Sequence, residues 1–371
     1  MKVIAALVAL LSGCGEFPEL NHGHTKDAGG PSQGGGSSGT GGGGASNAGG
    51  SGGGGASNAG GSGGGGASNA GGSGGSGGGG RANTGGSAGG GSGGGGSPGA
   101  GGGGGAGAVP SAGCGKSPTL KSGKQSLQGR SFILRISDTY DINQPHRLIF
   151  GFHWNGGTAE DVDGGGTSGY TWSYYGLREQ AGSSTIFVAP QGNNNGWANP
   201  GNADLKFVDD MVALIEGDLC VDTTRIFSMG FSYGGGMSYA IACARAKVFR
   251  AVAVYSGAQL SGCEGGNDPI AYIGFHSISD GTCGIGGGRA LRDRFVQNNG
   301  CTAQNPPEPS QGSLTHVVTS YSGCRPGYPV TWAAFNGGGH TPAPVDGFND
   351  ASGGGDKTWT KAEAWKFFTQ F

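Results

Sequence analysis

Ser232 lies in the pattern Gly-x-Ser-x-Gly, residues 230–234, and is the clearest candidate nucleophile in the chain. A run typical of a β-strand, residues 225–228, precedes it, and a helical pattern over 237–246 follows it. Small residues on both sides let the backbone turn sharply between strand and helix, so that the serine hydroxyl projects above the sheet. Most of the 91 glycines lie in a distant low-complexity region, whereas this copy has the flanks that the turn requires. The pattern predicts a nucleophile elbow with Ser232 at its tip.

A serine hydroxyl needs a base that takes its proton, and the base needs an acid that holds its tautomer. In α/β-hydrolases the acid and then the histidine follow the serine along the chain, each just after a strand. Asp280 follows a predicted strand over 270–275, and His340 follows another over 329–335 through glycines that let its loop bend back. We therefore expect Ser232, Asp280 and His340 to form the catalytic set. The alternatives for the base are His146, His153, His276 and His316, and those for the acid are Asp268 and Asp346.

Attack on a carbonyl also needs two backbone N–H groups that meet the negative charge developing on the carbonyl oxygen. One usually belongs to the residue after the nucleophile, here Tyr233, and the other to the loop after an early strand. That loop is His-Trp-Asn-Gly-Gly-Thr, residues 153–158, directly after a predicted strand over 147–152. Within it we favour the N–H of Asn155 over that of Trp154.

Strand and helix patterns alternate along the C-terminal part of the chain. Further strands are expected at 131–136, 185–189 and 249–255, and further helices at 204–219, 290–296 and 360–368. The last helix begins with Thr360 and Glu363 in the spacing of a capping box. Near-continuous apolar strands that alternate with helices are typical of a doubly wound, mainly parallel sheet. The expected fold class is therefore α/β, of the α/β-hydrolase type.

Composition divides the chain into two unlike parts. Residues 28–112 are nearly all Gly, Ser, Ala or Asn, with Arg81 as the only charge, and contain three tandem copies of an 11-residue repeat over 41–73. Such a sequence has no apolar face to bury, so we expect a disordered linker over 14–112 and one folded domain over 113–371. The net charge of −2 and the lack of a basic run argue against nucleic acid as a partner.

The first residues have the features of an export signal. Lys2 precedes an apolar run over 3–11, which is too short to span a bilayer. Leu-Ser-Gly-Cys at 11–14 resembles the lipobox of bacterial lipoproteins, in which the cysteine becomes the lipidated first residue of the mature chain. We expect a signal peptide over 1–13 and membrane contact only through a lipid on Cys14, with an ordinary signal cleaved nearby as the alternative. The expected location is extracytoplasmic, as a surface or outer-membrane lipoprotein or a secreted protein.

Four short motifs mark the folded part: Phe-His-Trp-Asn-Gly-Gly-Thr at 152–158, Asp-Thr-Thr-Arg-Ile-Phe at 222–227, Gly-Phe-Ser-Tyr-Gly-Gly-Gly at 230–236 and Gly-Gly-His-Thr-Pro at 338–342. Together they resemble the secreted feruloyl esterases, which are related to polyhydroxybutyrate depolymerases. The resemblance covers essentially 114–371, and Trp154 points to the feruloyl esterase branch. It implies the same catalytic set as above. One departure is the segment from His276 to Asp280, which lacks the glycine of the family's usual His-Gly-x-x-Asp.

The resemblance implies a serine esterase that cleaves feruloyl, or hydroxycinnamoyl, esters of plant cell-wall polysaccharide or its oligosaccharide fragments through an acyl-enzyme. The alternatives are an acetyl-xylan esterase or a polyhydroxybutyrate-type depolymerase, and a non-catalytic surface-binding lipoprotein. Trp154, Trp172 and Trp197 lie near predicted strand ends, where we expect them to line a pocket for an aromatic acyl group. Neither a cofactor nor a metal is expected, and we expect a monomer.

Eight cysteines in an exported chain predict disulfides, since the sequence has neither a C-x-x-C pair nor an H-E-x-x-H motif for a metal. Cys301 and Cys324 flank a predicted excursion before the His340 loop and form the best pair. Two more pairs are expected among Cys114, Cys220, Cys243 and Cys263. Cys283 lies in the segment that departs from the family pattern, and we expect it to be unpaired.

Overall fold

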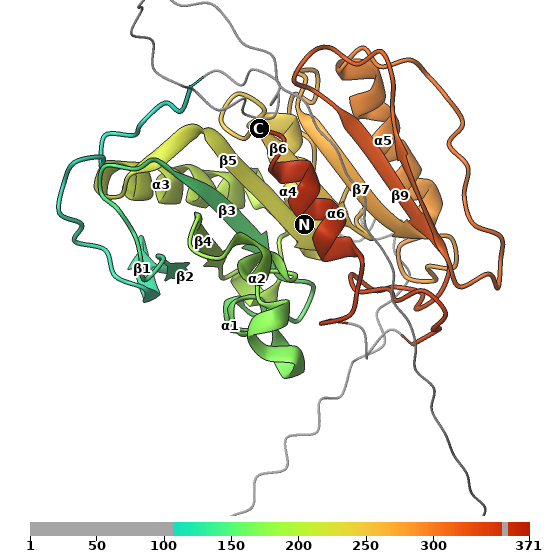
Figure 1. Cartoon of the computed structure of the whole chain (residues 1–371), viewed down its shortest axis with the longest axis horizontal. Coiled ribbons are helices and arrows are strands. Elements are labelled where there is room, and N and C mark those ends of the chain that lie inside the picture. Colours follow the sequence, from blue (N-terminus) through green and yellow to red (C-terminus); the bar gives the residue numbers. More distant parts are fainter. Residues whose placement is uncertain (1–106, 351–354) are drawn as a thin grey trace, which may run out of the picture. The chain divides into compact units, whose positions relative to one another are not determined.

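A nine-stranded sheet organises residues 107–350 and 355–371, which are the residues that the computed structural model describes (Figure 1). The strands are β1 Gly123–Leu127, β2 Arg130–Arg135, β3 His146–Phe152, β4 Thr185–Pro190, β5 Val221–Phe231, β6 Ala251–Tyr255, β7 Ala271–Ser277, β8 His316–Ser320 and β9 Val330–Phe335. Their order across the sheet is β1-β2-β4-β3-β5-β6-β7-β9-β8. Six adjacent strands run parallel to one another: β4, β3, β5, β6, β7 and β9. The strands at the edges, β1, β2 and β8, are antiparallel to their neighbours. The expectation of a mainly parallel sheet is confirmed.

The register brings the ends of the central strands together. Gly230, near the end of β5, pairs with Phe152 at the end of β3 and with Val254 near the end of β6. Farther along the sheet, Ser277 at the end of β7 pairs with Phe335 at the end of β9. The loops after these strands therefore leave the same edge of the sheet, which is where ligands bind in open α/β sheets.

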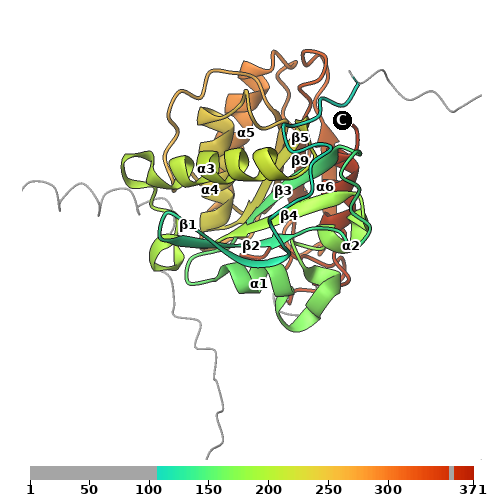
Figure 2. The same ribbon diagram turned by 90° about the vertical axis from the view of Figure 1, so that its left-hand side faces the viewer.

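Helices cover both faces of the sheet (Figure 2). They are α1 Ala159–Gly164, α2 Leu177–Ala181, α3 Ala203–Asp218, α4 Tyr233–Ala244, α5 Ile285–Asn298 and α6 Thr360–Phe368, with short 3-10 helices η2 Gly166–Trp172, η3 Asn193–Asn195 and η4 Pro200–Asn202. Apolar residues of α3, α4 and α5 pack in one core on one face, and those of α1, α2 and α6 pack in a second core on the other. Neighbouring strand residues alternate between the two: Ile149 belongs to the second core and Phe150 to the first. This two-sided burial explains the near-continuous apolar strands of the sequence.

One predicted detail of α6 is wrong. Thr360 and Glu363 do not form a capping box, because Trp359 is the residue that precedes the helix and no side chain caps it. The Thr360 hydroxyl instead donates to the carbonyl oxygen of Pro342 at 3.0 Å, which ties the start of α6 to the loop after β9. A capping box does occur in α1, between Thr158 and Asp161.

Disulfides join distant segments of the described chain. The predicted Cys301–Cys324 bond is confirmed, and the other four cysteines form Cys114–Cys220 and Cys243–Cys263. Cys283 is also disulfide-bonded, so the expectation that it is unpaired is wrong.

Contacts with the sheet begin at Val109, ahead of the predicted domain start at residue 113. The Ser111 N–H donates to the Val221 carbonyl oxygen at 2.8 Å, and the Thr223 N–H donates to that of Val109 at 2.9 Å. The predicted signal peptide, the cysteine at position 14 and the repeats lie outside the described residues. Over residues 107–350 and 355–371, no helix combines the length and apolar character needed to cross a membrane.

Candidate active site

Ser232 occupies a tight turn between β5 and α4, as the Gly-x-Ser-x-Gly pattern predicts. Its backbone has φ 54° and ψ −116°, and α4 begins at the next residue, Tyr233. A positive φ costs a residue with a side chain roughly 1–2 kcal/mol, so surrounding contacts must hold it there. One of them is a hydrogen bond of 2.9 Å from the Ser232 N–H to the carbonyl oxygen of Tyr255, at the end of β6. The turn leaves the Ser232 hydroxyl without a hydrogen bond to any described residue.

The two glycines of the pattern are required by close backbone approach. A Cβ on Gly230 would lie 2.3 Å from the carbonyl oxygen of Gly234, and a Cβ on Gly234 would lie 2.1 Å from that of Phe152. Both distances are far inside van der Waals contact. The contact at Gly234 also shows that the loop after β3 lies directly on the start of α4. A side chain at Gly230 would therefore disturb the elbow, and one at Gly234 would also disturb this loop.

Asp280 and His340 form a buried acid–base pair from the loops after β7 and β9. The His340 Nδ1–H donates to Asp280 Oδ2 at 2.8 Å, while the N–H groups of Thr282 and Cys283 donate to Oδ1 at 2.9 and 2.8 Å. Burial by itself would raise the pKa of Asp280. Hydrogen bonds from His276 and His340 outweigh this effect and hold the pKa well below its usual range. The carboxylate thus stays ionised and fixes the proton of His340 on Nδ1, which leaves the Nε2 lone pair free to accept a proton.

The imidazole of His340 lies beside the elbow. Its ring centroid is 4.7 Å from that of Phe231, the residue before Ser232. His340 Nε2 is buried and makes no hydrogen bond with any described residue. The structure therefore brings Asp280 and His340 together and places His340 beside the serine, without a direct serine–histidine hydrogen bond. Such bonds are often long before substrate binds.

His276, one of the alternatives for the base, holds the acid instead. Its side chain is almost completely buried, and Nε2 lies 2.6 Å from the Cys283 carbonyl oxygen and 3.4 Å from Asp280 Oδ2. The ring packs so closely on α5 that a Cβ on Gly288 would lie 2.2 Å from Nδ1. His276 is thus a positioning residue for the Asp280 loop, a role that the sequence did not indicate.

The loop after β3 offers unpaired N–H groups beside the elbow. The N–H groups of Trp154 and Asn155 make no hydrogen bond with a described residue, and that of Tyr233 belongs to the unpaired first turn of α4. A Cβ on Gly196 would lie 3.0 Å from the Tyr233 ring and 3.6 Å from Asn155 Oδ1, so these residues are neighbours. The arrangement can present two N–H donors to a carbonyl oxygen attacked by Ser232.

His153, at the start of this loop, is a structural residue. Its Nδ1–H donates to the carbonyl oxygen of Trp154 at 2.8 Å, and its Nε2 accepts from the Gly192 N–H at 3.0 Å. Burial lowers the pKa of His153 to about 4, so the ring is neutral near pH 7. It joins the loop after β3 to the loop after β4.

Trp197 does not fit the role expected for it. It has no exposed surface, and its indole N–H donates to the His153 carbonyl oxygen at 2.8 Å. The ring packs edge-on against Phe152, with centroids 5.0 Å apart. A fully enclosed side chain has no face to offer an acyl group, so Trp197 is a core residue that holds the loop after β3.

The other two tryptophans are partly accessible. Trp154 is half-buried, with its ring centroid 6.2 Å from that of Phe231. Trp172, at the end of η2, is also half-buried and meets Tyr175 edge-on at 5.9 Å. The Tyr175 hydroxyl donates to the Phe152 carbonyl oxygen at 2.7 Å, another support of the site that the sequence did not reveal. Trp154 and Trp172 thus keep surface that a ligand can contact.

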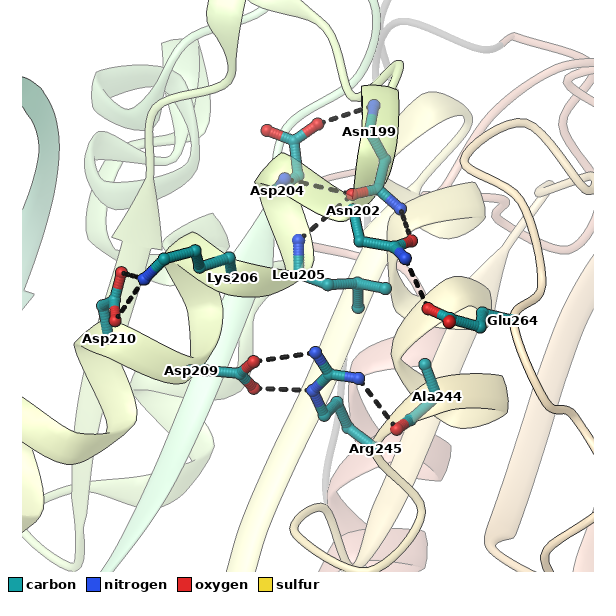
Figure 3. Close-up of polar contacts among 10 residues, drawn as sticks. All are labelled: Asn199, Asn202, Asp204, Leu205, Lys206, Asp209, Asp210, Ala244, Arg245 and Glu264. Atoms are coloured by element: carbon teal, nitrogen blue, oxygen red, sulfur yellow. Dashed lines mark hydrogen bonds and ion pairs between the residues drawn. The ribbon is translucent and has the colours of Figure 1, made fainter.

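The loop that carries Trp197 is anchored by amides and carboxylates (Figure 3). The Asn199 N–H donates to Asp204 Oδ2 at 2.8 Å, and Asn199 Oδ1 accepts from the Asp204 N–H at 3.0 Å. Asn199 Nδ2 also donates to the Ser261 carbonyl oxygen at 3.0 Å, and Asn202 donates to Glu264. These bonds tie the loop after β4 to the start of α3 and to the segment that follows β6.

The remaining candidates lie elsewhere. His146 is at the start of β3, at the opposite end of that strand from the elbow, and stacks on Tyr140. His316 on the edge strand β8 pairs with Asp346 at 2.8 Å, and Asp268 pairs with Lys247 at 3.6 Å. In the part of the chain that the structure describes, no three His, Cys, Asp or Glu side chains are grouped so that they could hold a metal ion.

A serine elbow on a mainly parallel sheet, with an Asp–His pair on loops after later strands, defines an α/β-hydrolase. No protein-family model matches the chain. The probable feruloyl esterase C of Aspergillus clavatus is 47% identical over 255 residues, covering 69% of this chain and 89% of that protein. Feruloyl esterase D of Neurospora crassa is 44% identical over 268 residues, covering 70% and 89%. The chain belongs to the feruloyl esterase family and is a carboxylic ester hydrolase.

The solved structures with a similar fold have much lower sequence identity to this chain. An acetyl xylan esterase from Aspergillus awamori gives a TM-score of 0.46 at 15% identity, over 65% of this chain and 94% of that one. A ferulic acid esterase from Anaeromyces mucronatus, in complex with ferulic acid, gives 0.43 at 14% identity, over 67% and 93%.

Proposed function

We propose that this esterase hydrolyses feruloyl and related hydroxycinnamoyl esters of plant cell-wall polysaccharide or its oligosaccharide fragments. The observation that carries the proposal is the identity of 44–49% to proteins named feruloyl esterases, over 84–89% of their lengths. Those matches cover 62–70% of this chain.

In the proposed mechanism, the Ser232 hydroxyl oxygen attacks the ester carbonyl carbon while His340 Nε2 takes its proton. The N–H of Tyr233, with that of Asn155 or Trp154, stabilises the negative oxygen of the tetrahedral intermediate. The intermediate collapses to an acyl-enzyme as His340 gives the proton to the departing alcohol oxygen. Water then attacks the acyl-enzyme by the same route and releases the acid. Asp280 keeps the proton of neutral His340 on Nδ1 and stabilises the imidazolium that forms twice in each cycle.

A substrate panel tests the acyl preference. Methyl ferulate, acetylated xylan and short hydroxybutyrate oligomers differ in their acyl groups but share the ester bond. We expect the highest kcat/KM for methyl ferulate, with Ser232→Ala as the inactive control. A clear preference for acetylated xylan would instead assign the enzyme to the acetyl-xylan esterases, and a preference for the oligomers to the depolymerases.

The proposed setting is outside the cytoplasm. The disulfides of the described residues support an oxidising compartment. We further propose that the signal peptide is removed on export and that residues 14–106 form a flexible linker. The monomeric state stays a prediction.

A further inference from the structure

A cavity of about 380 Å³ opens beside the acid–base pair. Its wall includes Ser279, Gln311, Asn336, Gly338, Gly339 and Asn349. The volume lies in the range of small-molecule sites, which begins at roughly 300 Å³. None of the described residues that line it carries a charge. The cavity therefore suits a neutral polar ligand better than an anion or a cation.

Its wall is continuous with the proposed acid and base. Ser279 directly precedes Asp280, and Gly339 directly precedes His340, so each pair of Cα atoms is about 3.8 Å apart. A Cβ on Gly339 would lie 3.8 Å from the Ser279 carbonyl oxygen, which shows that the two loops meet here. A group bound in the cavity would therefore lie on the His340 side of the site.

One amide of the wall is buried but incompletely bonded. Asn336 is 5% exposed, and its Oδ1 accepts a hydrogen bond of 3.2 Å from the Leu314 N–H. That bond identifies Nδ2 as the free end of the amide, and Nδ2 donates to no described residue. Nδ2 is not one of the fully enclosed side-chain atoms that lack a partner, so a ligand or water in the cavity can accept from it. Gln311 adds an exposed side chain that also makes no hydrogen bond with a described residue.

The mechanism of ester cleavage determines which part of a substrate lies next to His340. His340 must give its proton to the departing alcohol oxygen, so the alcohol part of the ester has to lie next to His340. In the proposed function that alcohol is a sugar hydroxyl. Sugar hydroxyls both donate and accept hydrogen bonds, as side-chain amides do, and they carry no charge.

We propose that this cavity binds the sugar that carries the acyl ester, with Asn336 Nδ2 and the Gln311 amide as specificity-determining contacts. The inference rests on the proposed function and adds the subsite for its leaving group. The enzyme would then be specific for the sugar as well as for the aromatic acid.

The test compares methyl ferulate with a feruloylated pentose oligosaccharide, which has the same acyl group on a sugar. Gln311→Ala should lower kcat/KM for the oligosaccharide relative to methyl ferulate by about three- to tenfold, the equivalent of one lost hydrogen bond. Asn336→Asp keeps the oxygen that accepts from Leu314 but replaces the amide donor with a charged carboxylate oxygen. Because both esters meet the added charge, the ratio isolates the lost donor, and it should shift in the same direction. Gln180→Ala, an exposed glutamine on α2, should leave the ratio unchanged.

A second measurement separates binding from turnover. With Ser232→Ala as the background, Gln311→Ala should weaken binding of the feruloylated oligosaccharide by a similar factor. If wild type hydrolyses both esters and both variants keep its ratio of kcat/KM values, the sugar does not bind in this cavity. If wild type hydrolyses neither ester, the proposed function fails and this inference fails with it.

Discussion

Two loops flank Ser232, and they are held in contrasting ways. The loop after β3 is fixed by buried polar bonds: His153 joins it to Gly192, Trp197 donates to its backbone, and the Gly156 N–H donates to Asn195 at 2.8 Å. In the loop after β9, Asn336 is followed by three successive glycines at φ 115°, 67° and 57°, and residues 346–350 are exposed. Among the described residues, its hydrogen bonds to the site include the Asp280–His340 bond and a bond of 3.3 Å from Ser256 to the Thr341 carbonyl oxygen.

The contrast matches what each loop has to do. N–H donors stabilise a developing charge most when they are already in place, so their loop should be rigid. The base has to exchange a proton with two different oxygens, first of the serine and then of the departing alcohol, so its loop needs less constraint. Changes in the β3 loop should therefore affect all ester substrates alike, whereas changes near the β9 loop should depend on the alcohol part.

The largest effect on kcat is expected from substitution of Ser232, which lies between the two loops. Ser232→Ala should reduce kcat by about 10⁴-fold or more, because without the hydroxyl only charge stabilisation and binding remain. Labelling by a fluorophosphonate should disappear while the unfolding transition stays cooperative. Persistent labelling of the variant would place the nucleophile elsewhere.

The second-largest effect is expected from loss of the hydrogen bond between Asp280 and His340, on the loop after β9. Asp280→Asn should lower kcat by roughly 10³–10⁴-fold, since an asparagine can no longer hold the His340 proton on Nδ1 as the carboxylate does. Steady-state kinetics on methyl ferulate measures this, with Asp268→Asn on the surface as the matched control. A near-normal rate for Asp280→Asn would transfer the role of acid to another residue.

The β3 loop should be sensitive to acid. His153 has a pKa near 4 in the folded protein and near 6.5 when unfolded, so between these values the unfolded state binds more protons. Stability should therefore fall as the pH drops from about 6.5 to about 4, by up to roughly 3 kcal/mol from this group, and no further below that. Denaturant unfolding at a series of pH values checks this. His153→Gln, which can donate and accept without titrating, should show a smaller slope, and an equal slope would remove His153 as the cause.

The smallest effect is expected from the indole N–H of Trp197. Trp197→Phe keeps an aromatic ring, although a smaller one, and leaves the His153 carbonyl oxygen unpaired. The lost hydrogen bond should cost about 1–3 kcal/mol of unfolding free energy. The rate should drop by the same factor for methyl ferulate and for a short acetate ester. A loss confined to methyl ferulate would mean that Trp197 contacts the acyl group after all.

Much of the fold could be predicted because its signals are local. The apolar run before the elbow, the helical spacing in α3 and the glycines that flank Ser232 each reflect a requirement within a few residues. The positions of Asp280 and His340 followed from the order in which strands are added to such a sheet, and the structure confirms that these side chains meet.

What could not be predicted depends on contacts between segments far apart in the chain. Trp197 looks like a pocket residue from its place after a strand, but burial against Phe152 and His153 decides its role. His276 precedes Asp280 by four residues, and only its contacts with Asp280 Oδ2 and the Cys283 carbonyl oxygen show that it supports the acid. Thr360 fits a capping box by spacing, but its hydroxyl donates to the Pro342 carbonyl oxygen instead.

The Cys114–Cys220 bond determines where mechanical load enters the domain. A pull transmitted through residue 107 first meets the hydrogen bonds of Val109 and Ser111 to β5, and at Cys114 the disulfide carries it covalently to the residue before β5. β5 runs from there to the elbow, and at about 3.3 Å per residue its far end lies roughly 30 Å away. The load would be borne at the end of the strand remote from Ser232, and it would bypass β1 to β4 altogether. A pull on residue 107 therefore acts on β5 at the end far from the serine.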